Sequence, residues 1–310
     1  MLWYVPHIYG DFHCIATACK HNCCIGWEID IDDRTKEAYR GVTGPFGERL
    51  ANSICEADGV SSFRLIEGER CPFLNCQNLC DIHLVLGEEA LCQICRDHPR
   101  FRNYFSSRGE IGLGLSCEAA ARLILNEQEP MTFIPLFDDG EDGVDHSEWE
   151  DTLLRIRETL YHIAQNRNQG IDTREEQLLT CVNATLPSFP WEEWVNIFLS
   201  LERMDPLWET MLAPCKEVEG VPQMMNETPY EQFLVYLLFR HVADAVDEYD
   251  LKARVAFCVL SSRLLRVVAS VNPTVELTEC ARLFSAEVEY SEDNLDQLLA
   301  LLEEQQMEVW

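Results

Sequence analysis

Cysteine is concentrated at one end of this chain. Of the 15 cysteines in 310 residues, 11 lie within the first 117 residues. They are Cys14, Cys19, Cys23, Cys24, Cys55, Cys71, Cys76, Cys80, Cys92, Cys95 and Cys117. The opening residues 1–14 lack the basic, apolar and small-residue segments of a secretion signal, so we expect a soluble cytoplasmic protein with reduced thiols. Such a cluster of reduced thiols favours a metal or iron-sulfur centre over a disulfide framework.

The second half of the chain has a helical pattern. From residue 147 onward, apolar residues recur at intervals of three and four, as in Leu153, Ile156 and Leu160. Ser147 and Glu150 have the spacing of a capping box at the start of the first of these helices. We therefore predict an all-helical domain at 146–310, built from six or seven helices.

The first 136 residues are less regular. We predict short helices at 33–39, 46–54 and 84–95. We predict strands at 63–66, 100–105 and 110–115, with the last two joined as a hairpin by the turn at 106–109. The acidic, glycine-containing residues 137–145 are expected to be a linker. The predicted fold class is therefore mostly α, with an irregular cysteine-rich module at 1–136 that holds short β-hairpins, followed by the helical domain.

The chain is strongly acidic. It has 54 Asp and Glu residues against 24 Lys and Arg residues, a net charge of −30, and residues 118–310 carry 38 of the acidic side chains. This charge would repel a phosphate backbone, so we do not expect nucleic acid as a partner. No segment approaches the roughly 18 apolar residues of a membrane span, so no membrane partner is expected. The acidic helical domain is expected to present a solvated surface that can also attract a basic partner.

Thiolates are soft metal ligands, and a closed zinc or 4Fe-4S site needs four of them. The spacing differs from the two paired C-x-x-C elements of a zinc ribbon, because only Cys92 and Cys95 form such a pair. It also differs from the C-x-x-x-C-x-x-C run of radical-forming iron-sulfur enzymes, because Cys23 is followed directly by Cys24. The individual motifs are therefore weak, and the joint pattern carries the information.

An ordered series of short motifs resembles the flagellin lysine-N-methylase family. The motifs are F-x-C-I at 12–15, C-x-x-x-C-C-x-G-W at 19–27, C-P-F-L at 71–74, L-C-x-I at 79–82, L-G-E-E-x-L-C-x-I-C at 86–95, P-R at 99–100, and L-S-C with A-A-R-L-I-L at 115–125. The series covers about residues 1–125. The C-P-F-L and L-C-x-I elements also look like those of a wider group of zinc- or iron-chelating cysteine-cluster proteins.

This resemblance implies a 4Fe-4S protein that transfers methyl groups from S-adenosylmethionine to lysine side chains of flagellin or another lysine-bearing protein. The cysteines that match the pattern are Cys14, Cys19, Cys23, Cys24, Cys71, Cys80, Cys95 and Cys117. The ligands favoured by the wider group are Cys24, Cys71, Cys80 and Cys95, with Cys19, Cys23 and Cys117 as further candidates. Of the other three cysteines of this segment, Cys55 is expected to be a buried small hydrophobic residue, and Cys76 and Cys92 are expected to be spare thiols.

Methyl transfer to lysine requires a neutral amine, so a site must desolvate the amine or accept its proton. Asp30, Asp32 and Glu110 lie near the matched motifs and are the candidate catalytic carboxylates, although each also suits a surface charge or a helix cap. Trp27 is a candidate for stacking on a cofactor or for anchoring the core. Arg100 is a candidate for binding the carboxylate of the methyl donor or for pairing with a nearby acidic residue.

One motif departs from the family pattern. The family reads S-C-P-E-A-A-R-L where this chain has Glu118 and Ala119 in place of the proline and the glutamate. Two alternatives to an enzyme therefore stay open. The first is a non-enzymatic interaction protein in which zinc or iron holds an irregular module together. The second is a redox sensor that uses Cys92 and Cys95.

Overall fold

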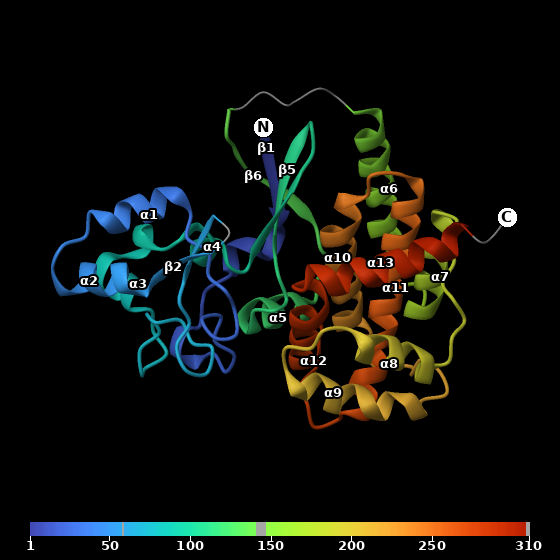
Figure 1. The fold of residues 1–310 in the computed structure, drawn as a ribbon. Coiled ribbons are helices and arrows are strands. Elements are labelled where there is room, and N and C mark those ends of the chain that lie inside the picture. Colours follow the sequence, from blue (N-terminus) through green and yellow to red (C-terminus); the bar gives the residue numbers. More distant parts are fainter. Residues whose placement is uncertain (58, 141–146, 308–310) are drawn as a thin grey trace. The chain divides into compact units, whose positions relative to one another are not determined.

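The computed structural model describes residues 1–57, 59–140 and 147–307. Its described part is mostly α-helical, as predicted. The chain forms two compact units, each described here by itself (Figure 1). We call Met1–Phe12 together with Phe101–Trp310 the helical unit, and His13–Arg100 the cysteine unit.

This division differs from the predicted modules 1–136 and 146–310. The first residues of the chain and the strands that follow residue 100 group with the helices, because apolar side chains such as Ile8, Phe105 and Leu113 belong to the core that the helices form. The first residues of the predicted linker at 137–145 have regular structure. Phe137 and Asp138 lie in a strand, and residues 141–145 lie outside the described part of the chain.

A four-stranded sheet belongs to the helical unit, in the order β4-β5-β1-β6. Its strands are β1 (Leu2–Pro6), β4 (Arg100–Tyr104), β5 (Arg108–Leu113) and β6 (Phe133–Asp138). Strand β1 runs parallel to β5 and antiparallel to β6, and it pairs Trp3 with Gly109. A Cβ at position 109 would lie 2.4 Å from the Trp3 ring, so only glycine fits there. The predicted β4–β5 hairpin is present, whereas β1 and β6 were missed because both are short and contain proline.

Helices make up most of the helical unit. They are α5 (Glu118–Leu125), α6 (Glu148–Ala164), α7 (Ile171–Cys181), α8 (Trp191–Ser200), α9 (Pro206–Leu212), α10 (Thr228–His241), α11 (Glu248–Val271), α12 (Leu277–Phe284) and α13 (Glu292–Met307). Among the described residues after 146 there are thus eight α-helices, where six or seven were predicted. Helix α11 is mostly buried and packs against α7, α10, α12 and α13.

Buried ion pairs join elements of the helical unit. The Arg157 guanidinium on α6 binds both oxygens of Glu110 on β5, at 2.9 and 2.7 Å. Arg174 on α7 binds Glu231 on α10 at 2.7 Å. Arg266 on α11 binds Glu175 on α7 at 2.7 Å. Each of these carboxylates is buried, so its charge is stabilised by the paired guanidinium rather than by water.

The cysteine unit is built from short elements. They are α1 (Asp33–Arg40), α2 (Gly44–Ser53), β2 (Ile54–Ala57), β3 (Val60–Phe63), α3 (Asp81–Leu86) and α4 (Gln93–Asp97). The helix predicted at 84–95 is wrong as a single element, because the chain turns at Gly87, whose φ of +89° is unfavourable for other residues. The strand predicted at 63–66 lies instead at β3, paired with β2.

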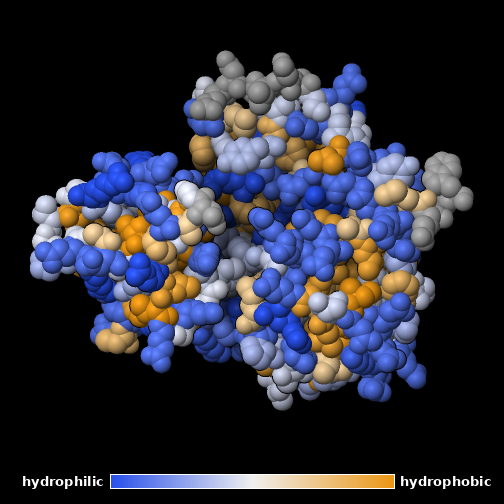
Figure 2. Space-filling view, in the orientation of Figure 1, coloured by the Kyte–Doolittle hydropathy of each residue, from blue (hydrophilic) through white to orange (hydrophobic). Residues whose placement is uncertain are grey.

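Figure 2 shows hydrophilic side chains over much of the visible face, interrupted by apolar patches. This agrees with the high content of acidic residues. Among the helices in the described ranges, none combines the length and the apolar character that crossing a membrane requires.

The Glu110–Arg157 pair gives a test of the fold. Burial opposes ionisation of Glu110, but Arg157 and Arg108 outweigh it and lower the pKa of Glu110 below its ordinary value of 4.5. Replacement Glu110→Ala leaves the Arg157 charge buried and unpaired, and we expect it to lower the free energy of unfolding by about 3–5 kcal/mol. Urea denaturation at neutral pH measures this.

The double variant Glu110→Leu/Arg157→Met is the control, because it removes both charges and should recover much of the loss. The pKa of Glu110 is lower in the folded state than in the unfolded state. Ionised Glu110 therefore stabilises the folded chain at neutral pH, and this contribution is lost as the pH falls through the pKa of the folded state. A single variant as stable as the wild-type chain would contradict the structural role of this pair.

Candidate metal centre

Two segments of the cysteine unit meet at Cys24 and Cys71. The Cys71 amide donates a hydrogen bond of 2.8 Å to the Cys24 carbonyl, and the Gly26 amide donates one of 3.0 Å to Glu69. Gly26 has a φ of +78°, which favours glycine at this turn. Backbone pairing therefore brings together two cysteines that are far apart in sequence.

A closed turn brings Cys71 and Cys80 together. The Leu74 amide donates to the Cys71 carbonyl at 3.1 Å, and Leu74 forms an isolated β-bridge with Cys80. The side chain of Asn75 accepts a hydrogen bond of 3.1 Å from the Leu79 amide. The C-P-F-L and L-C-x-I motifs thus form the two sides of one turn that Asn75 stabilises.

Two short helices begin directly after cysteines. Cys80 precedes α3, Cys92 precedes α4, and Cys95 lies within α4. Burial raises the pKa of Cys80, and the nearby amides of His83 and Ile82 oppose part of this rise. Backbone amides of this kind stabilise a thiolate and are common around metal-bound sulfur.

Six thiols of the cysteine unit interact with one another, and we call them the thiol group. They are Cys23, Cys24, Cys71, Cys80, Cys92 and Cys95. Four of them interact in the pairs Cys24–Cys71, Cys24–Cys95, Cys71–Cys95, Cys71–Cys80 and Cys80–Cys95. These four are the ligands that the sequence favoured. The other two interact with members of the same set, Cys23 with Cys24 and Cys80, and Cys92 with Cys71 and Cys95.

Burial and neighbouring thiols shift the pKa values of the cysteines in the thiol group. Burial raises the pKa of Cys71 to about 11. The hydrogen bond from Cys24 lowers the pKa of Cys23 to about 7, and the same bond raises the pKa of Cys24. Most of these thiols therefore hold their protons at neutral pH, and a metal that binds them as thiolates must displace those protons.

The thiols of this group are neighbours without converging on one point. Within the described ranges, no three side chains of His, Cys, Asp or Glu are placed so that they could hold a single metal ion. A 4Fe-4S cluster has a different requirement, because its four thiolates each bind a different iron. The donor set of four cysteines in mutual interaction fits the chemistry of such a cluster.

Two further predicted ligands have other surroundings. The Cys19 sulfur donates a hydrogen bond of 2.9 Å to the His21 carbonyl. Cys117 immediately precedes α5 and belongs to the helical unit, not to the cysteine unit.

Two of the three predicted catalytic carboxylates have structural partners. Asp32 caps α1 by accepting from the Thr35 amide at 2.9 Å, and it also accepts from the Gln93 amide at 2.9 Å. Burial opposes ionisation of Asp32, but these amides outweigh it and lower its pKa. Glu110 lies in the helical unit and is saturated by its guanidinium partners. Asp30 is exposed.

The predicted cofactor residues lie at different parts of the cysteine unit. Trp27 is half-buried beside the Cys24 segment. Arg100 is the first residue of β4 and donates a hydrogen bond of 3.4 Å to the Arg96 carbonyl. Burial, with a smaller effect of Arg100, lowers the pKa of His98 to about 4, so this imidazole is neutral at neutral pH.

Cys92 and Tyr39 are the residues that the sequence reasoning missed. Cys92 was expected to be a spare thiol, but it is buried and belongs to the thiol group. The Tyr39 hydroxyl lies 3.6 Å from the Cys92 sulfur. The C-x-x-C spacing was the available signal, because it places Cys92 about one helical turn from Cys95. For Tyr39 no local signal existed.

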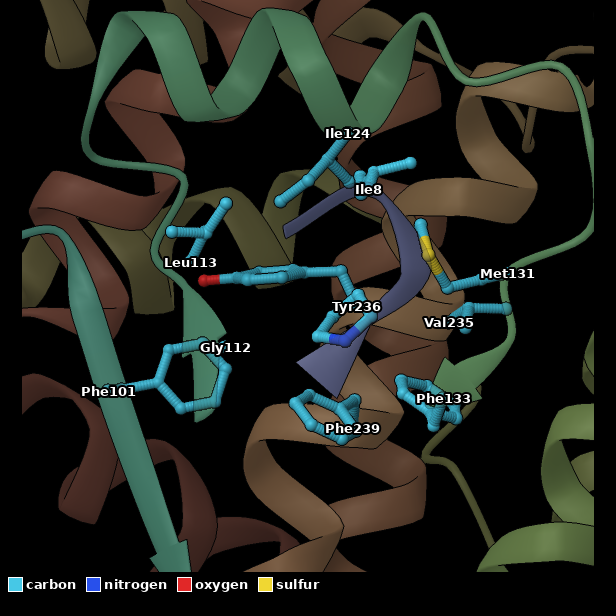
Figure 3. A pocket seen from close by; sticks show the side chains of 11 residues that line it. Ile8, Phe101, Gly112, Leu113, Ile124, Met131, Phe133, Val235, Tyr236 and Phe239 are labelled. Atoms are coloured by element: carbon cyan, nitrogen blue, oxygen red, sulfur yellow. The ribbon is translucent and has the colours of Figure 1, made fainter. Parts of the chain in front are cut away.

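The helical unit contains a small apolar pocket (Figure 3). Rings of Phe101, Phe133 and Phe239 line it together with Tyr236. The Tyr236 hydroxyl is already bonded to Glu289 at 3.0 Å and to a guanidinium. Guanidinium groups also lie 5.0 Å from the Phe101 ring centre and 5.6 Å from that of Phe239, so a cationic ligand is disfavoured. This pocket suits a small neutral group and not a lysine side chain.

Comparison with known proteins gives matches to part of the chain. No protein-family model matches it, and no solved structure matches it. The flagellar biosynthetic protein FliU of Salmonella muenchen is 28% identical over 132 residues, which are 41% of this chain and 78% of FliU.

Two proteins named lysine-N-methylase also match. Those of Salmonella choleraesuis strain SC-B67 and Salmonella typhimurium strain LT2 are 27% and 28% identical over 132 residues, which are 41% of this chain. The matched stretch spans 33% of the length of each of these two relatives. These similarities confirm the predicted resemblance to flagellin lysine-N-methylase-like proteins.

Proposed function

We propose that this chain is a protein-lysine N-methyltransferase that carries a 4Fe-4S cluster and uses S-adenosylmethionine to methylate lysine side chains of flagellin. The observation that carries the proposal is the mutual interaction of four thiols in a chain similar to proteins named lysine-N-methylase. The name of FliU supports a flagellar substrate.

The cluster would be held by Cys24, Cys71, Cys80 and Cys95. Backbone pairing joins the segments of Cys24 and Cys71, Cys80 precedes α3, and Cys95 lies within α4. When bound, the cluster supplies a centre that can accept an electron or bind a ligand at an iron. Four thiolates bound to one cluster would also cross-link the cysteine unit, whose apolar core is small.

The methyl donor supplies an electrophilic carbon, and the lysine Nζ must attack it with a free lone pair. The chain's part is therefore to bind the lysine and remove its proton. Because Asp32 and Glu110 serve structural roles, the exposed Asp30 is the remaining carboxylate of the three for this step. The net charge of −30 favours the approach of a lysine-bearing protein surface.

A second candidate function is a non-enzymatic cysteine-cluster protein that binds zinc or iron and interacts with a partner. One observation favours it: two of the three candidate carboxylates are engaged as a helix cap and as a buried ion-pair partner. In this case the metal would act only as a structural staple.

Anaerobic purification distinguishes the two metals. We expect about four irons and four acid-labile sulfides per chain, with visible absorption that bleaches on reduction. Replacement Cys71→Ala should remove most of the iron, because it deletes one of four ligands. The variant Cys76→Ala is a matched control from the same turn, and its exposed thiol lies outside the thiol group. One zinc per chain and no colour would contradict the cluster.

A methylation assay tests the activity. Iron-loaded protein incubated with S-adenosylmethionine and purified flagellin should add methyl groups to lysines, detected by peptide mass spectrometry. We expect Cys71→Ala to abolish the transfer and Cys76→Ala to retain it. Replacement Asp30→Asn should lower kcat by about 10²-fold or more if Asp30 accepts the amine proton. Iron-loaded protein that transfers no methyl group would instead support the non-enzymatic alternative.

A further inference from the structure

We propose that Asp32 is a positioning residue of the metal centre. Its carboxylate caps α1 and α4 together and, with Tyr39, holds the segment that carries Cys92 and Cys95. Because this role requires a metal centre in the cysteine unit, it rests on the proposed function. It is the same whichever cysteines of the thiol group are the ligands. Asp32 then contributes to metal retention and not to the removal of a proton from lysine.

Helix α4 is too short to be stable by its own hydrogen bonds. It has only five residues, Gln93–Asp97, and a helix of this length does not offset the cost of its nucleation. Its N-cap residue is Cys92, whose side chain makes no capping hydrogen bond. The first amides of α4, in the turn that carries Cys95, therefore need acceptors from elsewhere in the chain.

Asp32 supplies one such acceptor from another helix. Its Oδ1 accepts a hydrogen bond of 2.9 Å from the Thr35 amide and so caps α1. Its Oδ2 accepts one of 2.9 Å from the Gln93 amide, the first of α4, and one of 2.8 Å from the Thr35 hydroxyl. A negative charge at the N-terminus of each helix also interacts favourably with the helix dipole. A single carboxylate thus ties together the starts of two helices.

Tyr39 forms a second link between α1 and the same segment. Its hydroxyl donates a hydrogen bond of 2.8 Å to the Ala90 carbonyl, and its oxygen lies 3.6 Å from the Cys92 sulfur. The Tyr39 ring is buried and stacks on Phe63, with 6.2 Å between the ring centres. Asp32 and Tyr39 lie near opposite ends of α1, so this helix holds the chain on both sides of Cys92.

The held segment lies against other cysteines. Cys92 is buried in the small apolar core of the cysteine unit together with Cys71, and Cys24, Cys80 and Cys95 pack against this core. Without the two links the segment gains conformational freedom, which metal binding would have to remove again. The links therefore favour metal retention, and we expect their loss to speed the release of bound metal.

Two variants remove the links one at a time. Asp32→Ser keeps a side-chain oxygen that caps α1, because serine is a good N-cap residue, but it lacks the second oxygen that accepts from Gln93. Tyr39→Phe removes the hydroxyl and keeps the ring that packs on Phe63. The matched control is Asp33→Ser, which makes the same change of charge at the next residue, whose side chain is exposed.

The measurements separate positioning from folding. Full-length variants are reconstituted with iron and sulfide without oxygen, and iron per chain is determined. The rate at which the loaded protein gives up iron to an excess of chelator measures metal retention. In the metal-free chain, hydrogen–deuterium exchange of the peptide 90–97 measures the order of the held segment, and circular dichroism gives the thermal unfolding temperature.

We expect Asp32→Ser to release iron about tenfold faster than the wild-type chain, because it loses a hydrogen bond to a charged acceptor. Tyr39→Phe should release it about fivefold faster, because it loses a neutral hydrogen bond. Both variants should take up deuterium faster in the peptide 90–97. Asp33→Ser should match the wild-type chain in both readouts. A link variant that holds no iron, with Asp33→Ser loaded, would show the same effect in a stronger form.

Three outcomes would overturn the role of Asp32 alone. They are wild-type release rates in both link variants, equally fast release from Asp33→Ser, and a lower unfolding temperature of metal-free Asp32→Ser without faster iron release. If Asp32→Ser is unfolded, the release rate of Tyr39→Phe decides. A wild-type chain that binds no iron would overturn the proposed cluster itself, and the role of Asp32 with it.

Discussion

The mutual placement of four thiols is the constraint on which the cysteine unit depends. Its apolar core is small and includes cysteines itself, among them Cys71 and Cys92. Its helices are short, and α3 and α4 have only one or two turns each. Elements of this length gain little stability from their own hydrogen bonds. A set of thiols bound to a common centre would supply the cross-links that such a unit needs.

The helical unit is stabilised in a different way. Long helices bury a large apolar core, and buried guanidinium–carboxylate pairs join elements across it, as with Arg157 and Glu110. These charges are costly to bury singly but are compensated in pairs. The same pairing removes Glu110 from acid–base chemistry, because a carboxylate that accepts from two guanidinium groups is a poor proton acceptor. Structural and catalytic uses of a buried carboxylate thus exclude one another here.

Helix α1 connects the structural and the proposed chemical roles of the cysteine unit. Asp32 caps the start of α1 and also accepts a hydrogen bond from the Gln93 amide at the start of α4. Tyr39, near the end of α1, contacts the sulfur of Cys92. A carboxylate that was a candidate base therefore acts as a support for the thiol group. The similarity to proteins named lysine-N-methylase spans a third of the length of those proteins.

The sequence by itself determined the helical character of the second half, because the apolar period of a helix is local. The choice of Cys24, Cys71, Cys80 and Cys95 as ligands came from the resemblance of their motifs to those of a wider group of proteins, and it stays a prediction. The tertiary structure alone decided the unit boundaries, the structural role of Asp32, and the contact of Tyr39 with Cys92. These depend on which distant segments pack together. A side chain in a given sequence pattern can cap a helix, pair with a charge or contact a thiol. The packing of the folded chain decides which of these roles it has.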